Sequence, residues 1–460
     1  MVFLTLIFIV VHSSTNFLSR YTHQTVELKD NINIDYRYFI DKKQSASPEK
    51  MLELLQQFIP EDAKNIPYQL ADQTYWVLGK YLNNSNQTEA FVLHIDNAML
   101  DVLEVYELDQ FLNITQVFNL KDFTQNNEIL TFPHFSFELT PFQDKRFLIK
   151  LKTYGPPEIP INLYKTQAFN DNLQGSIALY GAFVSCIVLM ALYNLVLYLS
   201  IRDKVYLCYL TYLVSTFLTV TSLNGFGYLL FGYELQQWLQ SHIIQVNIII
   251  IISLLLFTSY FLQYDQEDSW VAKTSSTLCI VLGIIGIGLS YTDLIFQAKV
   301  FFSIQPFFYL YAIFIIAQKL TTTFTWARFY FISWLPFLGG AAIQPLALLN
   351  IIESSFWTNH AFLIGVMVET TFMAFALGER MRMSEQQKIA TLTYHEDTKI
   401  LKSLNLENRI KQLRMQGETD FAVLAIEPEQ INVVSMKWAL STYCLNNSKK
   451  KKLPFLLSLF

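Results

Sequence analysis

The chain has 460 residues, of which 52% are hydrophobic and only 15% are charged. Soluble domains usually carry about 25% charged residues, so the composition argues against a protein that is soluble along its whole length. The net charge of −5 at pH 7 and the lack of a basic field do not favour nucleic acid as a partner.

The first residues have the pattern of a signal peptide. Met1–Val11 is an apolar run (MVFLTLIFIVV), followed by small polar residues. Such a run is too short to span a bilayer but suits the central region of a secretion signal. We predict a signal peptide at 1–20. Because a basic region and an A-x-A site are missing, an uncleaved anchor or a wrongly assigned start stays open.

Residues 25–168 are predicted to form an extracytoplasmic all-β domain, a sandwich or jelly roll. The segments LGKYLNNSN, AFVLHIDNAMLDVLEVYEL and RFLIKLKTY alternate apolar and polar residues, which is the period of half-buried strands. Turn formers such as Asp96-Asn97 separate them. Several short strands at this spacing favour a sandwich.

Aromatic residues of this domain are candidates for ligand binding. They are Tyr75, Trp76, Tyr81 and Tyr106. If exposed, they could form a platform on which a carbohydrate ring stacks. The alternative is that Trp76 is an ordinary core residue of the sandwich, which is the commoner place for such a side chain.

The region 173–382 contains seven apolar segments that are each long enough to cross a bilayer. A hydrocarbon core about 30 Å thick needs roughly 20 helical residues, and backbone groups in lipid must bond within the segment. We place the spans at 176–200, 205–223, 243–264, 271–292, 299–318, 327–351 and 360–378. A bundle of seven transmembrane helices is therefore predicted.

Basic residues in the loops predict the orientation. On the side opposite residues 25–168, the loops and the exit from the last span carry Arg202, Lys204, Lys273, Lys319, Arg328, Arg380 and Arg382. The other side carries only Lys299, at a helix edge. Because cytoplasmic loops are enriched in Lys and Arg, we place the N-terminal domain outside and the C-terminus in the cytoplasm.

Three polar residues inside the spans are candidates for a conformational switch. Glu369 lies near the middle of the last span, where a carboxylate is costly and must face the bundle interior. With Asn194 and Gln344, it could hold a polar contact that differs between two packings of the bundle. The alternative is a structural hydrogen bond between helices, with Asn194, Gln344 or Asn247 as the partner of Glu369.

The four cysteines suggest neither a disulfide framework nor a metal site. Cys186, Cys208 and Cys279 lie in predicted spans, and Cys444 lies near the C-terminus. No paired-cysteine spacing occurs, so we predict no metal ion and no cofactor.

The polar stretch 383–415 is predicted to be a cytoplasmic signalling helix that could pair with the same helix of a second copy. DFAVLAIEPE (420–429) reads as a buried strand. Too few residues follow it to complete a domain, so 416–460 is interpreted as a truncated effector fragment.

The apolar block resembles a family of bacterial receptors. The segment LYGAFVSCIVLMALYNLVLYLSIRDKVYLCYLTYL and the segment GVMVETTFMAFALGERM are similar to the first two helices and the last helix of seven-transmembrane receptors with diverse intracellular signalling modules (7TMR-DISM). Tyr75-Trp76 resembles the tyrosine–tryptophan strand of that family's type 2 extracellular module. The resemblance implies an outer domain similar to carbohydrate-binding jelly rolls.

The tail resembles the opening of a GGDEF (diguanylate cyclase) domain. LNLENRIKQL contains the matching Asn408-Arg409, and DFAVLAIEPEQI follows it. No Gly-Gly-Asp/Glu-Glu-Phe motif occurs in the chain. The resemblance therefore implies an inactive, truncated output domain, and we predict no catalytic residue and no enzyme activity.

These observations together predict a sensory receptor of the bacterial inner membrane. A small extracytoplasmic ligand, with carbohydrate as a candidate, would change the packing of the helices, and the cytoplasmic helix would carry the change to a partner. A homodimer through that helix is the candidate assembly. The alternatives are a remnant of a membrane-bound cyclic-di-GMP signalling protein and, less favoured because internal repeats are missing, a transporter.

Overall fold

The structure is a computed structural model in which the chain forms two compact units, Met1–Met373 and Ala374–Phe460. It describes residues 32–42, 46–61, 66, 73–95, 97–120, 133–153, 161–265, 269–320, 325–348, 352, 355–393, 401–402, 415, 422–425 and 455–459. The predicted signal peptide at 1–20 and most of the predicted effector fragment at 416–460 lie outside these residues.

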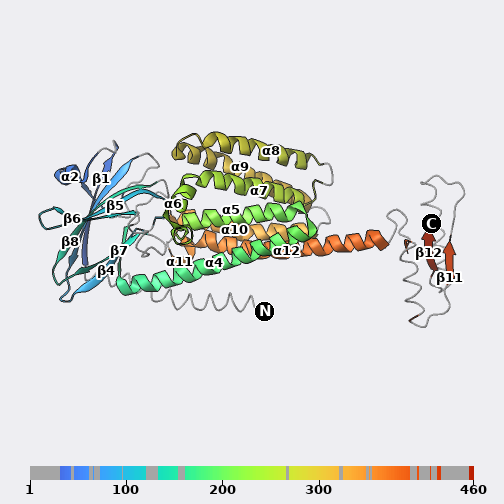
Figure 1. Cartoon of the computed structure of the whole chain (residues 1–460), viewed down its shortest axis with the longest axis horizontal. Coiled ribbons are helices and arrows are strands. Elements are labelled where there is room, and N and C mark those ends of the chain that lie inside the picture. Colours follow the sequence, from blue (N-terminus) through green and yellow to red (C-terminus); the bar gives the residue numbers. More distant parts are fainter. Residues whose placement is uncertain are drawn as a thin grey trace. The chain divides into compact units, whose positions relative to one another are not determined.

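The N-terminal domain consists of two antiparallel sheets (Figure 1). One sheet has the order β2-β1-β3-β8-β5-β6, and the other has the order β7-β4-β9. The strands are β1 Ile32–Asp41, β2 Ile59–Pro60, β3 Thr74–Asn83, β4 Glu89–Ile95, β5 Leu100–Leu108, β6 Ile114–Asn119, β7 His134–Leu139, β8 Asp144–Thr153 and β9 Ile161–Lys165. The predicted β-rich domain is confirmed, whereas its jelly-roll form stays a prediction.

The two sheets pack around one apolar core. Successive side chains of a strand point to opposite faces, and the inward positions are aromatic or aliphatic, as at Tyr81, Phe91, Phe137 and Phe147. The outer face of the larger sheet is covered as well. Met51 of α2 (Pro48–Glu53) and Phe58, just after η1 (Leu55–Gln57), form a second cluster there.

Long helices follow the sheet domain. They are α4 Thr166–Ile201, α5 Lys204–Leu223, α7 Ile243–Phe261, α8 Trp270–Leu289, α9 Leu294–Leu320, α10 Thr325–Leu348 and α12 Ala361–Thr393, with the shorter α6 Gly227–Ser241 and α11 Phe356–Asn359 between them. Within the described residues, six are long and apolar enough to cross a membrane: α4, α5, α7, α8, α9 and 361–386 of α12. The prediction of several membrane spans is confirmed, and the count of seven stays a prediction.

The polar loop residues end and begin these helices. Arg202 has a φ of 57°, the left-handed conformation that terminates α4. The Asp203 carboxylate accepts a hydrogen bond from the Val205 amide at 3.0 Å and so caps α5. Ser269 caps α8 in the same way through the Val271 amide at 3.2 Å. These short polar segments therefore fix where α5 and α8 start.

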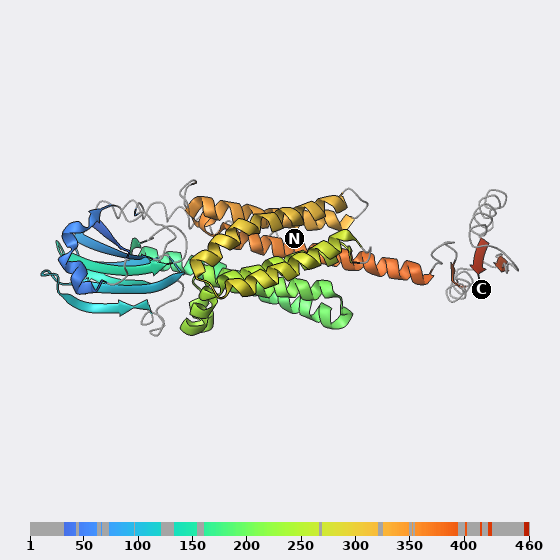
Figure 2. The ribbon, with the colours of Figure 1, turned by 90° about the horizontal axis from the view of Figure 1, so that it is seen from above.

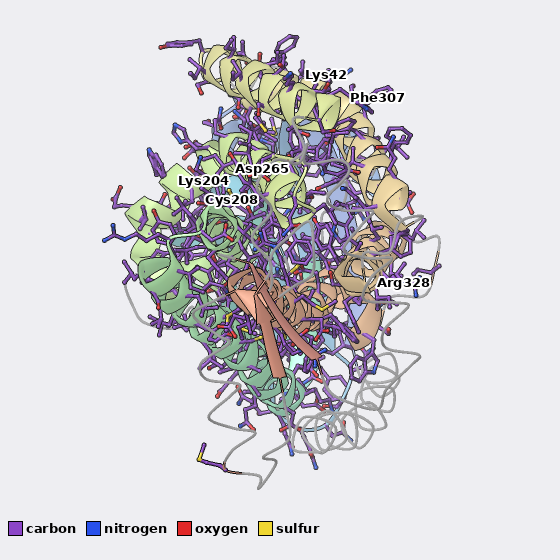
Figure 3. The ribbon with its side chains drawn as sticks, turned by 90° about the vertical axis from the view of Figure 1, so that its right-hand side faces the viewer. Lys42, Lys204, Cys208, Asp265, Phe307 and Arg328 are labelled. Atoms are coloured by element: carbon purple, nitrogen blue, oxygen red, sulfur yellow. The ribbon has the colours of Figure 1, made fainter. Side chains whose placement is uncertain are left out.

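Basic residues gather at one end of the bundle. Lys204 begins α5, Lys319 lies in the last turn of α9 and Arg328 lies in the first turn of α10; Figure 3, a view along the bundle, labels Lys204 and Arg328. The sheet domain packs against the opposite end, where α6 lies between it and the bundle (Figure 1). This arrangement follows the charge bias of cytoplasmic loops, and it agrees with a sheet domain outside the membrane.

The second unit contains, in its described part, the end of α12 and a parallel sheet of order β10-β12-β11. The strands are β10 Leu401–Lys402, β11 Ala422–Ala425 and β12 Phe455–Leu459. The strand predicted at 420–429 overlaps β11. The helix predicted at 383–415 overlaps the last residues of α12.

Candidate functional site

The aromatic pair on β3 is enclosed by protein. Tyr75 and Trp76 are consecutive, so their side chains point to opposite faces of the sheet. Tyr75 belongs to the core between the sheets, and Trp76, with 0% of its surface exposed, lies in the outer cluster with Met51 and Phe58. Tyr81 is buried in the inner core. The aromatic faces are therefore not presented to solvent as a platform.

Tyr106 completes the outer cluster. Its ring stacks on Trp76 with 6.3 Å between the centroids, and its hydroxyl donates to the Glu104 carboxylate. Lys150 Nζ lies 5.7 Å from the centre of the Trp76 ring and 2.9 Å from Glu104 Oε2. Burial, and then the bond to the carboxylate, raise the pKa of Tyr106. The geometry is that of a packed core, which was the alternative interpretation of Trp76; ligand binding by these residues stays a prediction.

Glu369 of α12 lies inside the helical bundle, with 3% of its surface exposed. The hydroxyl of Tyr212, on α5, donates to Glu369 Oε2 over 3.4 Å, and the hydroxyl of the adjacent Thr370 lies at the same distance. The expectation that Asn194, Gln344 or Asn247 would be its partner is wrong. Tyrosine on α5 takes that place, and the contact links α12 to α5.

A cluster of aromatic rings extends from this contact across the bundle. The ring of Tyr209 stacks on Tyr212 with 5.8 Å between centroids and lies 5.2 Å from Phe257 of α7. Phe257 lies 5.6 Å from Tyr330 of α10, whose hydroxyl is 2.6 Å from Thr258 Oγ1. The spacing of three residues between Tyr209 and Tyr212 places both on one face of α5. Four helices therefore meet around Glu369.

Asn194 and Gln344 form their hydrogen bonds with residues other than Glu369. Asn194 is fully buried on α4, and its Nδ2 donates to the Met190 carbonyl of the same helix at 2.8 Å. Its Oδ1 has no partner among the described residues. Gln344 Oε1 accepts from the Phe362 amide at 3.1 Å and joins α10 to the first turn of α12. The structure therefore does not bring the three predicted switch residues into one site.

A contact between the sheet domain and the bundle was not predicted from the sequence. Tyr228 of α6 is part of the core of the sheet domain, and its hydroxyl donates to the Ala98 carbonyl over 3.4 Å. Gln240 Nε2 also donates to the Ala98 carbonyl, and Gln237 Nε2 donates to the Leu100 carbonyl over 3.4 Å. One helix of the membrane region thus supplies a core residue and three hydrogen bonds to the outer domain.

A polar cleft of about 330 Å³ lies beside this contact. Its walls come from the start of β5, from α6 and from the turn between α8 and α9: Met99, Leu100, Asp101, Gln237, Gln240, Ser241, His242, Ser290, Thr292, Leu294 and Gln297. Amides and hydroxyls predominate among these residues, and the Nε2 atoms of Gln237 and Gln240 donate to carbonyls of the sheet domain. A small, neutral, hydrogen-bonding molecule fits this chemistry.

Two histidines lie where the sheet domain meets α4. His94 and His134 are directly opposite each other on β4 and β7. Both rings pack on Phe169 of α4, with 5.4 Å and 4.7 Å between centroids. Burial, and then the proximity of His134, lower the pKa of His94 from 6.5 to about 3. The folded protein therefore keeps His94 neutral.

We expect the folded protein to lose stability as the pH falls below about 6.5. Between that pH and about 3, the unfolded chain binds a proton at His94 that the folded chain does not bind. The expected loss is at most ~1.4 kcal/mol for each pH unit. Melting temperatures of the full-length protein across this range would measure it. His94→Gln should flatten the slope and His242→Gln should not; an unchanged slope in His94→Gln would contradict the assignment.

Two protein-family models match the chain. The model described as 7TM diverse intracellular signalling matches residues 176–380, and the model described as 7TMR-DISM extracellular 2 matches residues 34–165. Both matches support membership of the 7TMR-DISM family. A search of curated proteins found no match.

The two 7TMR-DISM matches coincide with the sheet domain and with the helical bundle. The extracellular match covers the two sheets, and the 7TM match begins within α4 and ends within α12. With the apolar helices, they support a multi-pass membrane receptor that has an extracellular sensor domain. In the described part of the chain, no three His, Cys, Asp or Glu residues are placed to hold a metal ion.

Proposed function

We propose that this 7TMR-DISM protein is a sensory receptor of the bacterial inner membrane that binds a small ligand outside and passes a change in helix packing to the cytoplasm. The observation that carries the proposal is Tyr228, a residue of the membrane region that lies in the core of the sensor domain. A change in that core must move α6, because interiors are close-packed and adjust only by discrete repacking.

The polar cleft is the ligand site that the geometry supports best. It touches both the sensor domain, through Met99, Leu100 and Asp101, and the ends of the membrane helices. A ligand there has different contacts when the two parts shift, and such a difference in affinity is what drives a conformational change. Sugars and polyols are suitable because each hydroxyl both donates and accepts hydrogen bonds. A ligand could reach Trp76 only after α2 and η1, which cover it, had moved away.

Glu369 is the proposed switch inside the bundle. Its long contact with Tyr212 and the aromatic cluster around it join α12 to three other helices. A small rearrangement of α5, which ends next to α6, would change this contact and reposition α12. The output would pass from α12 to a cytoplasmic partner, without an enzymatic activity of this chain.

The first test is a ligand screen on the full-length protein in lipid nanodiscs. Neutral sugars, polyols and small amides would be titrated while the melting temperature is followed. We expect a compound that stabilises the protein saturably, and we expect Gln237→Leu to weaken it by about tenfold, the value of one lost hydrogen bond. Gln116→Leu, an exposed change on β6, is the matched control. Loss of binding in Trp76→Phe but not in Gln237→Leu would place the site at the aromatic pair instead.

The second part of the test separates binding from transmission. Tyr212→Phe removes the hydroxyl that contacts Glu369 and should leave the affinity for the compound unchanged. The compound should alter hydrogen exchange along α12 in the wild type and should no longer alter it in Tyr212→Phe. The same exchange response in both proteins would rule out this contact as the switch.

A further inference from the structure

The helix α6 has two sides of different character. Its Tyr233 packs against the core of the sensor domain, and three of its residues form hydrogen bonds to that domain, namely Tyr228, Gln237 and Gln240. Residues two positions apart in a helix of 3.6 residues per turn lie on nearly opposite sides. Leu230, Leu235 and Trp238 each lie two positions from one of these three, and they are exposed, Leu235 to 46% and Trp238 to 55%.

The apolar side of α6 therefore faces away from the sensor domain. A spacing of two residues between a residue that bonds to the sensor domain and an exposed apolar residue occurs three times along the helix. The pairs are Tyr228 and Leu230, Gln237 and Leu235, and Gln240 and Trp238. Gln236, fully buried, donates from Nε2 to the Ser222 carbonyl at the end of α5 over 3.1 Å. That bond fixes the rotation of α6 about its axis, so the exposed apolar side is a fixed feature of the fold.

The placement of α6 puts this side at the level of the membrane surface. In Figure 1 the helix is seen nearly end-on between the sheets and the bundle, and in Figure 2 it projects sideways from the outer end of the bundle. It therefore runs crosswise to the spanning helices. Leu223, the last residue of the spanning helix α5, is also exposed, and α6 begins four residues after it.

The composition of α6 suits a membrane surface. Glu234 is its only charged residue, and the exposed Trp238 is an aromatic residue of the kind enriched where lipid meets water. Gly232 has a φ of 75° and a ψ of 175°, which a residue with a Cβ rarely adopts. The break divides the helix into 227–231 and 233–241, and each segment has at least one exposed apolar residue.

We propose that α6 lies along the outer leaflet of the bilayer, with Leu230, Leu235 and Trp238 in the lipid and its polar side against the sensor domain. The outer leaflet is the partner because exposed apolar residues occur both at the end of α5 and on α6 and because α6 lies crosswise at the outer end of the bundle. The helix then seats the sensor domain on the membrane, independently of which ligand the protein binds.

Spin labels on cysteines test this placement in phosphatidylcholine nanodiscs. Leu235→Cys carries the label of interest, in full-length protein whose four native cysteines are replaced by alanine. Phe111→Cys, in an exposed turn of the sensor domain, is the control for water, and Ile284→Cys, exposed in the middle of α8, is the control for the lipid interior. Accessibility to oxygen and to a water-soluble nickel complex is measured at each position.

The expected result at position 235 is an accessibility to nickel several-fold below that at 111, with oxygen accessibility between the two controls. The same accessibility to nickel as at 111 would overturn the proposal. Protection from both reagents would also overturn it, because a protein surface would then cover the helix. If the cysteine replacements prevent folding, tryptophan fluorescence of the wild type and of Trp238→Phe is measured in bromine-labelled lipids instead. The difference between the two proteins is the fluorescence of Trp238, and the proposal requires bromines near the headgroup to quench it most strongly.

Discussion

Replacing Trp76 with alanine should destabilise the sensor domain by about 3–5 kcal/mol. The indole is fully buried, stacks on Tyr106 and lies under the ammonium group of Lys150. The change leaves a cavity beneath α2 and also removes the surface that holds Lys150 and Glu104 in place. A residue whose only role is ligand binding would give a much smaller loss of stability.

The measurement is denaturant unfolding of the purified full-length protein, with hydrogen exchange in β3 and β8 as the local readout. Phe111→Ala is the matched control, because it removes another aromatic ring that is 85% exposed. Equal stability of the two variants would show that Trp76 does not stabilise the fold. It would favour the hypothesis that Trp76 belongs to an aromatic ligand-binding platform.

Replacing Gly365 with leucine should disrupt the contact between α10 and α12. A Cβ at this position would lie 2.5 Å from the Pro336 carbonyl oxygen and 3.4 Å from Gly340 Cα. Gly340 is equally confined, since its Cβ would lie 2.4 Å from the Ala361 carbonyl oxygen. Small residues let backbones of membrane helices approach this closely. Because backbone atoms cannot move aside as side chains do, we expect a loss beyond the ~1–3 kcal/mol that is typical of overpacking.

Melting curves of the detergent-solubilised protein would measure this effect. Gly283→Leu is a matched control on α8, where a Cβ would meet nothing within 4 Å. The control should keep the wild-type melting temperature, whereas Gly365→Leu should lower it strongly or prevent isolation of the folded protein. A normal melting temperature for Gly365→Leu would mean that the two helices do not pack closely here.

The sequence predicted best where one local pattern decides the structure. Apolar runs indicated the membrane helices, and alternation indicated the strands, because each pattern reflects a single buried face. The pattern was less informative at Tyr75 and Trp76, since alternation cannot show that both faces of β3 are covered by elements distant in the sequence. The partner of Glu369 was missed for a similar reason. Tyr212 is one of many tyrosines, and only the packing of α5 against α12 selects it.

The helix α6 was missed for a different reason. Its pattern mixes glutamines with leucines and is interrupted by Gly232, so it resembles neither a spanning helix nor an ordinary amphipathic one. One side of α6 contacts the sensor domain and another contacts the end of α5. Only the tertiary structure shows which residues belong to which side. The residues that join sensor and bundle therefore lie between the predicted spans 205–223 and 243–264, where no element was predicted.

The presence of Tyr228 in the core of the sensor domain sets where this protein can be divided. By sequence, the outer domain and the membrane region are separate modules that could be exchanged between receptors. By packing, an outer domain cut before α4 loses an aromatic residue from its core and exposes the apolar surface that the residue covered. A chimaera that transplants this outer domain must therefore bring α6 with it, together with the surface of the bundle on which α6 packs.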